Sequence, residues 1–209
     1  APMVLDLNGY TITADIKSEG RHHYAIDNYS VLTLKGEGAI DARGIENFGT
    51  MTIDGNITIT NVDTNGGAAI WNEGEVVING STSITANDQG NAAVAFDVCK
   101  YGSYEAPIVT VNTTGTITGK IEVSESINSN LNISGGTFTV ELDKAWCAEG
   151  FGPTDNGNGT YGVHEHVAGE PVVENNVAPD CDTEGSYDNV VYCTVGGEEL
   201  SRTTVTVPA

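Results

Sequence analysis

The sequence predicts an all-β protein, with a β-solenoid over residues 1–163 and a small β-hairpin-type appendage over residues 164–209. Three observations predict it. Val and Ile together number 37 against 7 Leu, beside 24 Thr, 19 Asn and 26 Gly, which is typical of strands and turns rather than helices. Short phrases of alternating apolar residues recur ahead of glycines. From residue 164 onward this rhythm ends, and nine acids, one base and three prolines follow.

The first recurring phrase ends in glycine and indicates the length of one coil. Leu5–Gly9 returns as Leu32–Gly36, Met51–Gly55 and Val76–Gly80, and more loosely at 109–112 and 131–136. The first four glycines are spaced 27, 19 and 25 residues apart. Intervals of this size indicate a repeat architecture, here with loops of unequal length. No coil can bury its own apolar face, so stacked neighbours supply the core.

A second recurring phrase has the same spacing along the sequence as the first and ends in asparagine. Ala25–Asn28 becomes Gly44–Asn47 and then Ala69–Asn72, at the same offsets of 19 and 25 residues. In parallel, in-register coils, equivalent side chains lie about 4.8 Å apart. We therefore expect the asparagines to pass amide hydrogen bonds from coil to coil as a ladder. The alternative is three ordinary turn asparagines. The ladder consists of Asn28, Asn47 and Asn72.

Charge and cysteine content narrow the function classes. Acidic side chains number 29 against 8 basic ones, for a formal net charge of −21. Such a chain has no basic cluster for nucleic acid and is repelled by anionic membranes, and no apolar run approaches the ~20 residues of a membrane span. Four cysteines are too few for a disulfide scaffold. A Cys181–Cys193 bridge would close a short loop, whereas Cys99 and Cys147 are equally consistent with buried free thiols.

Residues 1 to about 140 resemble the right-handed parallel β-helix domains of secreted and cell-surface proteins of gut Firmicutes. The phrase Leu5–Ile12 is similar to the opening of such domains, and the segments 135–140, 146–151 and 156–163 to their closing part. Residues 164–209 resemble a short repeat module of the same surface proteins, in Cys181–Asp188 and Val191–Arg202. The resemblance implies a right-handed parallel β-helix and a secreted or cell-surface location. It implies no particular activity.

One departure from that module concerns metal binding. Where Gly196 stands, the module usually has a second cysteine, which with Cys193, Cys181 and an upstream histidine could hold zinc. Since Gly196 removes a ligand, we expect no metal by that route and no cofactor. His164 and His166 flank Glu165 in a segment expected to be extended, which places both imidazoles on one face. Two ligands alone bind metal weakly, so a solvated connector is the favoured interpretation.

The residue before each ladder asparagine carries the best candidate chemistry. These residues are Asp27, Glu46 and Trp71, and one shared outward column would place two carboxylates one coil apart beside an indole. That separation is near the ~5–5.5 Å between the carboxyl groups of retaining glycosidases. A neighbouring column is expected to contain Asn8, Lys35, Asp54 and Asn79. Outward positions of an acidic protein are often acidic without a function, so the column alone does not indicate catalysis.

The expected role is a non-catalytic extracellular surface module that serves in adhesion, in glycan or host-protein contact, or as a stalk. Its expected partners are a glycan or a host or bacterial surface protein, with no nucleic acid and no membrane insertion. The candidate ligand-binding residues are Trp71, Tyr24 and Lys35, because aromatic rings stack on sugars. The alternative is a polysaccharide-active enzyme, a glycoside hydrolase or lyase, with Asp27, Glu46 and Asp54 as its carboxylates.

Overall fold

The chain divides into two compact units, Ala1–Val163 and His164–Ala209, which are described separately. This computed structural model describes residues 1–14, 23–63, 66–87, 93–100, 106–124 and 130–209. Within these ranges the protein is all-β, with many parallel strands, no α-helix and a short 3-10 turn, η3 (Lys144–Trp146). Strands follow one another at short intervals because β-branched residues alternate with turn-forming Gly and Asn.

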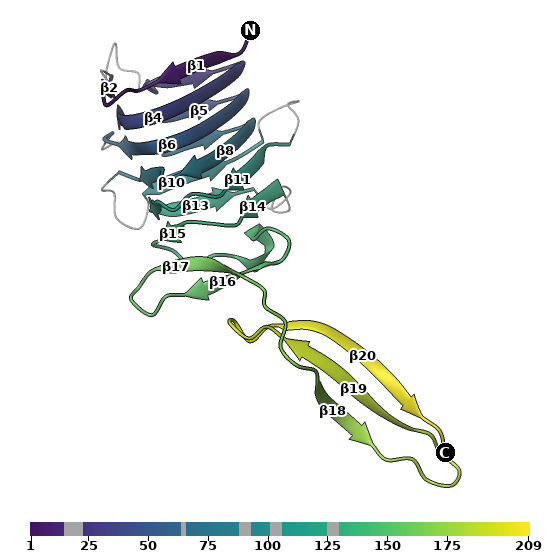
Figure 1. The fold of residues 1–209 in the computed structure, drawn as a ribbon. Helices are drawn as coiled ribbons and strands as arrows, with labels where there is room; N and C mark the ends of the chain where they lie inside the picture. The colour runs from purple at the N-terminus through teal and green to yellow at the C-terminus, as the bar shows by residue number, and fades with distance from the viewer. Residues whose placement is uncertain (15–22, 64–65, 88–92, 101–105, 125–129) are drawn as a thin grey trace. The chain divides into compact units, whose positions relative to one another are not determined.

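The first unit contains a mixed, nearly closed, barrel-like sheet of 12 strands and a sheet of five parallel strands (Figure 1). The larger sheet consists of β1 (Met3–Asp6), β2 (Thr11–Thr13), β4 (Val31–Ala42), β6 (Thr50–Asn61), β8 (Glu75–Gly80), β9 (Ser83–Thr85), β11 (Ile108–Val111), β12 (Thr116–Thr118), β14 (Leu131–Ile133), β15 (Thr137–Phe138), β16 (Phe151–Asp155) and β17 (Tyr161–Glu165). The smaller sheet consists of β3 (Ile26–Asn28), β5 (Ile45–Asn47), β7 (Ala68–Asn72), β10 (Val94–Val98) and β13 (Lys120–Val123). The larger sheet is mixed because β15 pairs with β17 in antiparallel orientation.

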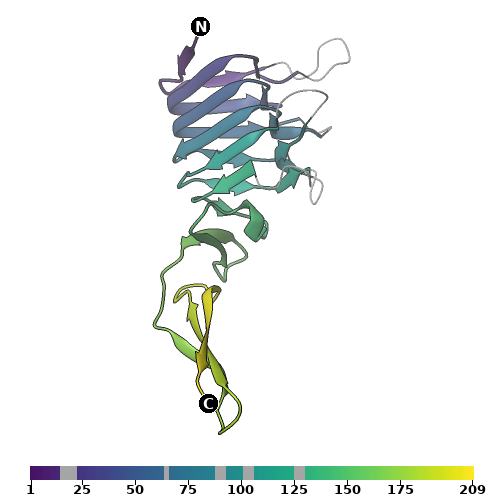
Figure 2. The same cartoon turned by 90° about the vertical axis from the view of Figure 1, so that its right-hand side faces the viewer.

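Parallel pairing places equivalent repeat positions one above another (Figure 2). β4 and β6 are each 12 residues long and pair in register along their whole length. Their offset of 19 residues and the offset of 25 between β6 and β8 are those of the recurring glycine phrase. We use the word rung for one such layer of strands.

The core is built from these stacked positions. One column of fully buried side chains passes through successive rungs, with each member paired in register to the next: Ile40, Ile59, Ile84, Ile117 and Phe138. A second column contains Leu34, Ile53, Ile78, Val111 and Ile133. β-Branched side chains suit this arrangement because they pack well on a pleated surface. Each such side chain contributes about 1.5–3 kcal/mol by leaving water.

The recurring glycines are explained by close approach between backbones. Gly36, Gly55 and Gly80 lie in register on three adjacent strands. A Cβ atom at Gly55 would collide with the carbonyl oxygen of Gly36, and one at Gly80 would lie 2.6 Å from that of Gly55. Gly80 also has a φ of +64°, in the region that favours glycine. Larger residues at these positions would therefore separate the rungs.

The first repeat is shifted by two residues from the register that the sequence predicts. Asp6, rather than Asn8, pairs with Lys35, and its carboxylate lies 3.5 Å from Nζ of that lysine. Asn8 lies in the following turn with a φ of +47°. A shift of two leaves every side chain on the same face of the sheet, so alternation cannot detect it. The neighbouring outward column is therefore Asp6, Lys35, Asp54 and Asn79.

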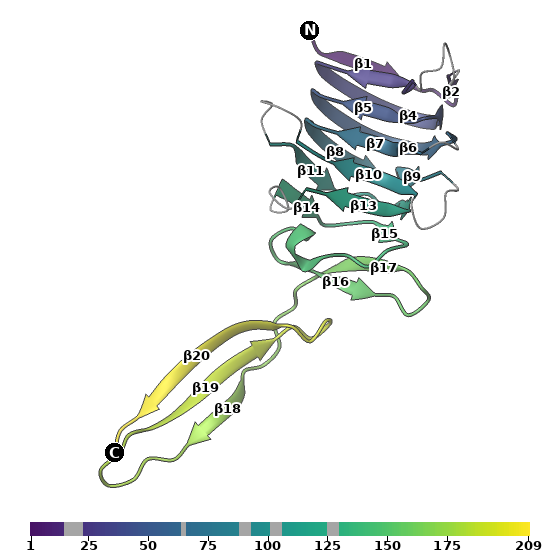
Figure 3. The same ribbon diagram turned by 180° about the vertical axis from the view of Figure 1, so that it is seen from behind.

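Buried asparagines connect the rungs at the ends of β3, β5 and β7; β5 and β7 are seen from behind in Figure 3. Nδ2 of Asn28 donates to Oδ1 of Asn47 over 2.7 Å, and Nδ2 of Asn47 donates to Oδ1 of Asn72 over 2.7 Å. Asn47 also donates to the carbonyl oxygens of Gly49 and Glu75. These are the amide-to-amide bonds that the repeat predicts, and they satisfy polar groups at most 6% exposed.

The second unit is an antiparallel sheet of three strands, β18 (Val172–Val177), β19 (Gly185–Tyr192) and β20 (Glu199–Val207). It therefore has one strand more than a single hairpin. Its strands pair in the order β18-β19-β20, with Val190 fully buried. Because the buried apolar content is small, polar contacts between the strands contribute much of the stability of this sheet.

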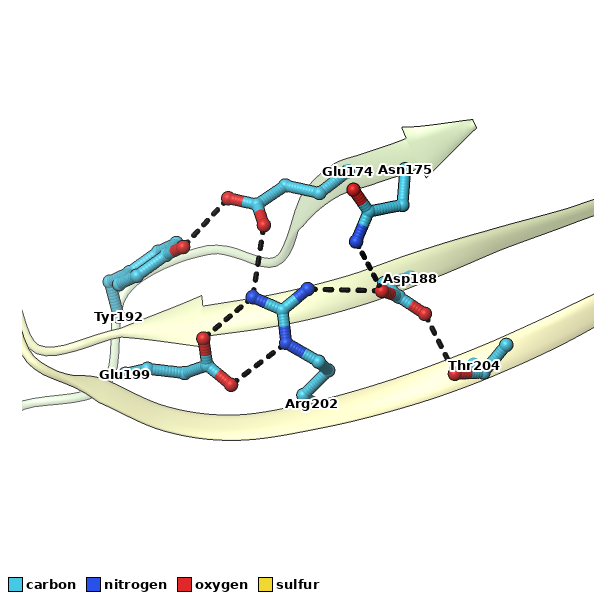
Figure 4. A network of polar contacts seen from close by, with 7 residues as sticks. All are labelled: Glu174, Asn175, Asp188, Tyr192, Glu199, Arg202 and Thr204. Carbon is cyan, nitrogen blue, oxygen red and sulfur yellow. Dashed lines mark hydrogen bonds and ion pairs between the residues drawn. The ribbon is translucent and has the colours of Figure 1, made fainter. Parts of the chain in front are cut away.

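Arg202, the single base of the second unit, links all three strands (Figure 4). Its guanidinium lies 3.0 Å from carboxylate oxygens of Glu174 and Asp188, and Nε donates to Glu199 over 2.9 Å. The hydroxyl of Tyr192 donates to Glu174 over 2.7 Å. Bonds from Tyr192 and Arg202 lower the pKa of Glu174, and those from Arg202 lower the pKa of Glu199. The pKa of Asp188 is lowered by hydrogen bonds from Asn175, Thr204 and Arg202. Asn175 and Thr204 complete the network by donating to Asp188.

Candidate functional site

The outward face of the five-stranded sheet carries a column of acids interrupted by one indole. Asp27, Glu46, Trp71, Asp97 and Glu122 occupy equivalent positions on β3, β5, β7, β10 and β13, each paired in register with the next. Asp27 and Glu46 are thus neighbours beside Trp71, as the offsets of the sequence predict. The column continues through two further acids that the loose later repeats did not reveal.

Trp71 is held in place by contacts on two sides. Its Nε1 donates to Oε1 of Glu73 over 3.0 Å, and the ring of Tyr24 meets it edge to face with centroids 6.5 Å apart. The guanidinium of Arg43 lies 5.1 Å from the Tyr24 ring centroid and 3.7 Å from Oδ2 of buried Asp63. The two predicted aromatic residues therefore lie together, and Arg43 brings a cation to them.

Burial and like charge raise the pKa of two carboxyls on this face. The pKa of Glu46 is raised by burial and by the nearby carboxylates Asp27 and Glu73. The pKa of Asp97 is raised by burial and by Glu122.

Two groups of another kind beside the column, a phenol and a thiol, keep their protons at neutral pH. Burial raises the pKa of Tyr24 to about 12, and burial together with Asp97 raises the pKa of Cys99 to about 12. Cys99 is therefore a thiol at neutral pH and not a nucleophilic thiolate.

The remaining predicted residues lie elsewhere. Lys35 and Asp54 belong to β4 and β6 of the larger sheet, where they pair with each other. The structure thus separates Asp54 from the Asp27–Glu46 pair, and Lys35 from Trp71 and Tyr24, by placing them on another sheet. Lys35 is half exposed and paired with Asp6.

A shallow hollow of about 320 Å³ lies where the chain turns from the smaller to the larger sheet. Its lining consists of Phe48, Gly49, Thr50, Glu73, Gly74, Glu75, Ala106 and Ile108. The ring of Phe48 stacks on that of Tyr29, with centroids 4.7 Å apart and 11° between the planes. Tyr29 is 69% exposed, so this pair presents an aromatic surface beside the hollow. Phe48 and Glu73 are not among the residues that the sequence predicts to bind a ligand.

Glu73 joins the hollow to the outward column. One oxygen, Oε1, accepts the indole hydrogen bond from Trp71. The other, Oε2, is buried and has no hydrogen-bond partner within the described ranges. Glu73 is 6% exposed, and a buried carboxylate oxygen without a donor costs free energy. Glu73 and Glu75 are the two carboxylates that line the hollow.

Comparison with known proteins identifies no relative: no family model, curated protein or solved structure matches this chain. In the parts of the chain that the structure describes, no helix is long and apolar enough to cross a lipid bilayer.

Proposed function

We propose that the first unit is a right-handed parallel β-helix of a secreted or cell-surface protein and serves as a non-catalytic module that contacts a glycan. Parallel, in-register rungs around one core support the architecture. The resemblance of residues 1 to about 140 to bacterial surface β-helices supports the location. The hollow beside Phe48 supports glycan contact over a plain stalk, because a stalk needs neither a concave site nor an aromatic surface beside it.

The observation that carries the proposal is the state of Glu73. Its carboxylate is fixed by Trp71 through Oε1, its Oε2 has no hydrogen-bond partner among the residues that the structure describes, and the residue lines a hollow with an aromatic wall. Sugar recognition combines these features, since an apolar ring face packs on an aromatic side chain while hydroxyl groups bond to fixed polar groups. Trp71 then acts mainly by positioning Glu73.

Charge defines the glycan class. Glu73 and Glu75 both line the hollow, and the whole chain has a net charge of −21. Uronate-rich and sulfated polysaccharides would be repelled, whereas neutral hydroxyl-rich glycans and amino sugars would not. We therefore infer a neutral or amino-sugar glycan as the ligand.

A polysaccharide-active enzyme is the second candidate, and one observation favours it. Asp27 and Glu46 are neighbours, and Glu46 has a raised pKa, as a general acid requires. The hollow, however, is lined by Glu73 and Glu75 and not by this pair. A substrate seated there would meet a carboxylate that is already bonded to an indole.

Glycan-array binding by the purified chain and its variants tests the proposal. Glu73→Gln and Phe48→Ala should each reduce binding at least about tenfold, because each removes one half of the recognition surface. Glu149→Gln is the matched charge control and Tyr10→Ala the matched aromatic control, since both residues are exposed and lie outside the hollow. Circular dichroism verifies folding of each variant.

The outcomes separate the two candidates. Unchanged binding by folded Glu73→Gln and Phe48→Ala would overturn the glycan site at the hollow. Release of new reducing ends by the wild-type chain, abolished in Asp27→Asn or Glu46→Gln, would replace the non-catalytic proposal with the enzyme. Glycan binding that depends on Glu73, without release of reducing ends, supports the proposal.

A further inference from the structure

An imidazole, a thiol and a carboxylate converge within the second unit. Nε2 of His164 lies 3.5 Å from Sγ of Cys193 and 3.4 Å from Oε2 of Glu198. All three atoms lie within 4.8 Å of one another. The His164 side chain is 9% exposed and Cys193 is 3% exposed, so the cluster is largely withdrawn from water.

Local backbone pairing builds this cluster. Ala168 and Cys193 form an antiparallel bridge, which brings the segment after His164 beside the end of β19. The chain then turns tightly: the amide of Gly197 donates to the carbonyl of Cys193 over 2.9 Å, and the amide of Cys193 donates to the carbonyl of Glu198 over 2.8 Å. Gly197 permits this turn with a φ of +77°. Cys193 and Glu198 thereby face the same imidazole.

Glu198 fills the space that a side chain at position 196 would occupy. A Cβ atom at Gly196 would collide with the carboxylate of Glu198. From the sequence, Gly196 is expected to remove a metal ligand. The turn instead allows a carboxylate from two residues further along the chain to enter the same space.

Hydrogen bonds alone leave the cluster unsatisfied. Nε2 of His164 carries at most one hydrogen, so it can donate to Sγ of Cys193 or to Oε2 of Glu198 but not to both. Oε2 of Glu198 is buried and, apart from its 3.4 Å contact with Nε2 of His164, has no hydrogen-bond partner among the described residues. Nε2 of the adjacent His166 is buried and has none there. The two imidazole centroids are 5.5 Å apart. A cation between the three donor atoms would satisfy them together.

We propose that His164, Cys193 and Glu198 form a binding site for a divalent transition-metal ion of the zinc type. The donor set of one imidazole nitrogen, one thiolate sulfur and one carboxylate oxygen is one that zinc accepts. Tetrahedral zinc bonds place a nitrogen and a sulfur ligand about 3.6 Å apart, and a nitrogen and an oxygen ligand about 3.3 Å apart. The distances of 3.5 and 3.4 Å agree with this geometry. Three protein ligands leave a fourth position for water or for the imidazole of His166.

The thiol is prepared for the role of ligand. Backbone amides of Gly196 and Val195 donate toward Sγ of Cys193. Thiolate is the form that binds metal. Cys181 lies in the same unit, is exposed, and belongs to no such cluster among the described residues. It therefore provides a matched control cysteine within the chain.

Titration of the reduced 209-residue chain with Co²⁺, followed by competition with Zn²⁺, tests the site. Co²⁺ in a tetrahedral site with a thiolate ligand gives intense visible bands and a sulfur-to-cobalt charge-transfer band. We expect these bands to saturate at about one equivalent per chain and to be abolished by Zn²⁺. Cys193→Ser should abolish the charge-transfer band, and Cys181→Ser should retain it. His164→Ala and Glu198→Gln should weaken binding at least about tenfold.

Glu198→Gln keeps the proposal testable if Cys193→Ser fails to fold, because Glu198 is partly exposed and Gln has nearly the same volume. Absence of a charge-transfer band in the folded wild-type chain would overturn the site. A band that survives in folded Cys193→Ser, or affinity unchanged in folded Glu198→Gln, would also overturn it. The readout is independent of glycan binding and of the first unit.

Discussion

Nδ2 of Asn47 donates a 2.7 Å hydrogen bond to Oδ1 of Asn72, a residue 25 positions further along the chain. Both side chains have no exposed surface, and the bond joins β5 to β7. The amide of Asn47 simultaneously accepts from Asn28. A single side chain thus connects three rungs.

Replacement of this amide should be costly. We expect Asn47→Ala to lower the free energy of unfolding of the first unit by about 2–4 kcal/mol, because Asn28 and Asn72 would each lose a buried partner. Urea denaturation followed by tryptophan fluorescence measures this unit alone, since Trp71 and Trp146 both belong to it. Asn132→Ala, at an exposed strand position, should change the value by less than about 0.5 kcal/mol. Equal effects of the two substitutions would refute the ladder as a source of stability.

The glycine column makes a second prediction. Gly55→Ala should destabilise the first unit by at least about 2 kcal/mol, since its Cβ atom would meet the carbonyl oxygen of Gly36 in the adjacent strand. Gly162→Ala is the control, because a Cβ atom there has ordinary contacts of 3.5–3.7 Å. The same fluorescence-monitored denaturation distinguishes them. A fully stable Gly55→Ala chain would be inconsistent with this spacing of the rungs.

Acid should weaken the second unit. The carboxyls of Glu174, Asp188 and Glu199 have lowered pKa values because of Tyr192, Asn175, Thr204 and Arg202, so the folded state binds their protons less tightly than the unfolded state. Their stabilisation is therefore complete above about pH 4.5 and is lost as the pH falls through the lowered values. Amide NMR signals of residues 172–207, recorded during urea titrations from pH 7 to 3, measure the effect. Arg202→Gln should flatten this pH dependence, and an equally steep dependence in the variant would contradict the assignment.

The first unit should respond to pH with the opposite sign. Glu46 and Asp97 have raised pKa values, caused mainly by burial, so the folded state holds their protons more tightly than the unfolded state. Their contribution to stability grows as the pH falls from neutral toward about 4.3. Urea midpoints from tryptophan fluorescence at pH 7.5 and pH 5 measure it. Glu46→Gln should raise the midpoint at pH 7.5 and reduce the difference between the two pH values; a lowered midpoint at pH 7.5 would oppose this account.

Some of the architecture could be predicted because a stacked repeat converts sequence offsets directly into spatial register. The shared offsets of 19 and 25 residues placed Asp27, Glu46 and Trp71 in one column and aligned the three asparagines. The predicted register of the first repeat was wrong, also for a physical reason. A shift of two residues keeps every side chain on the same face of the sheet, so alternation cannot reveal it. Only the turn at Asn8 decides that Asp6, and not Asn8, is the partner of Lys35.

The candidate sites were harder to predict because they depend on turns and not on the repeat. Glu73 directly follows a ladder asparagine, and the corresponding position in the rung before it is Phe48. These two equivalent positions of the repeat carry different residue types, so the repeat pattern did not mark them. In the structure, the acid and the aromatic residue at equivalent corners line one hollow. Glu198 was likewise hidden, because only the geometry of the turn through Gly197 brings it to Cys193.

Affinity electrophoresis of the purified wild-type chain is the direct test of whether this protein contacts a neutral or amino-sugar glycan. The gels would contain a neutral glycan, an amino-sugar polymer, a mucin or a polyuronate. We expect retardation in at least one neutral or amino-sugar gel, none in the polyuronate gel, and no cleared zone around the band. Unchanged mobility in every gel would contradict glycan contact by this protein.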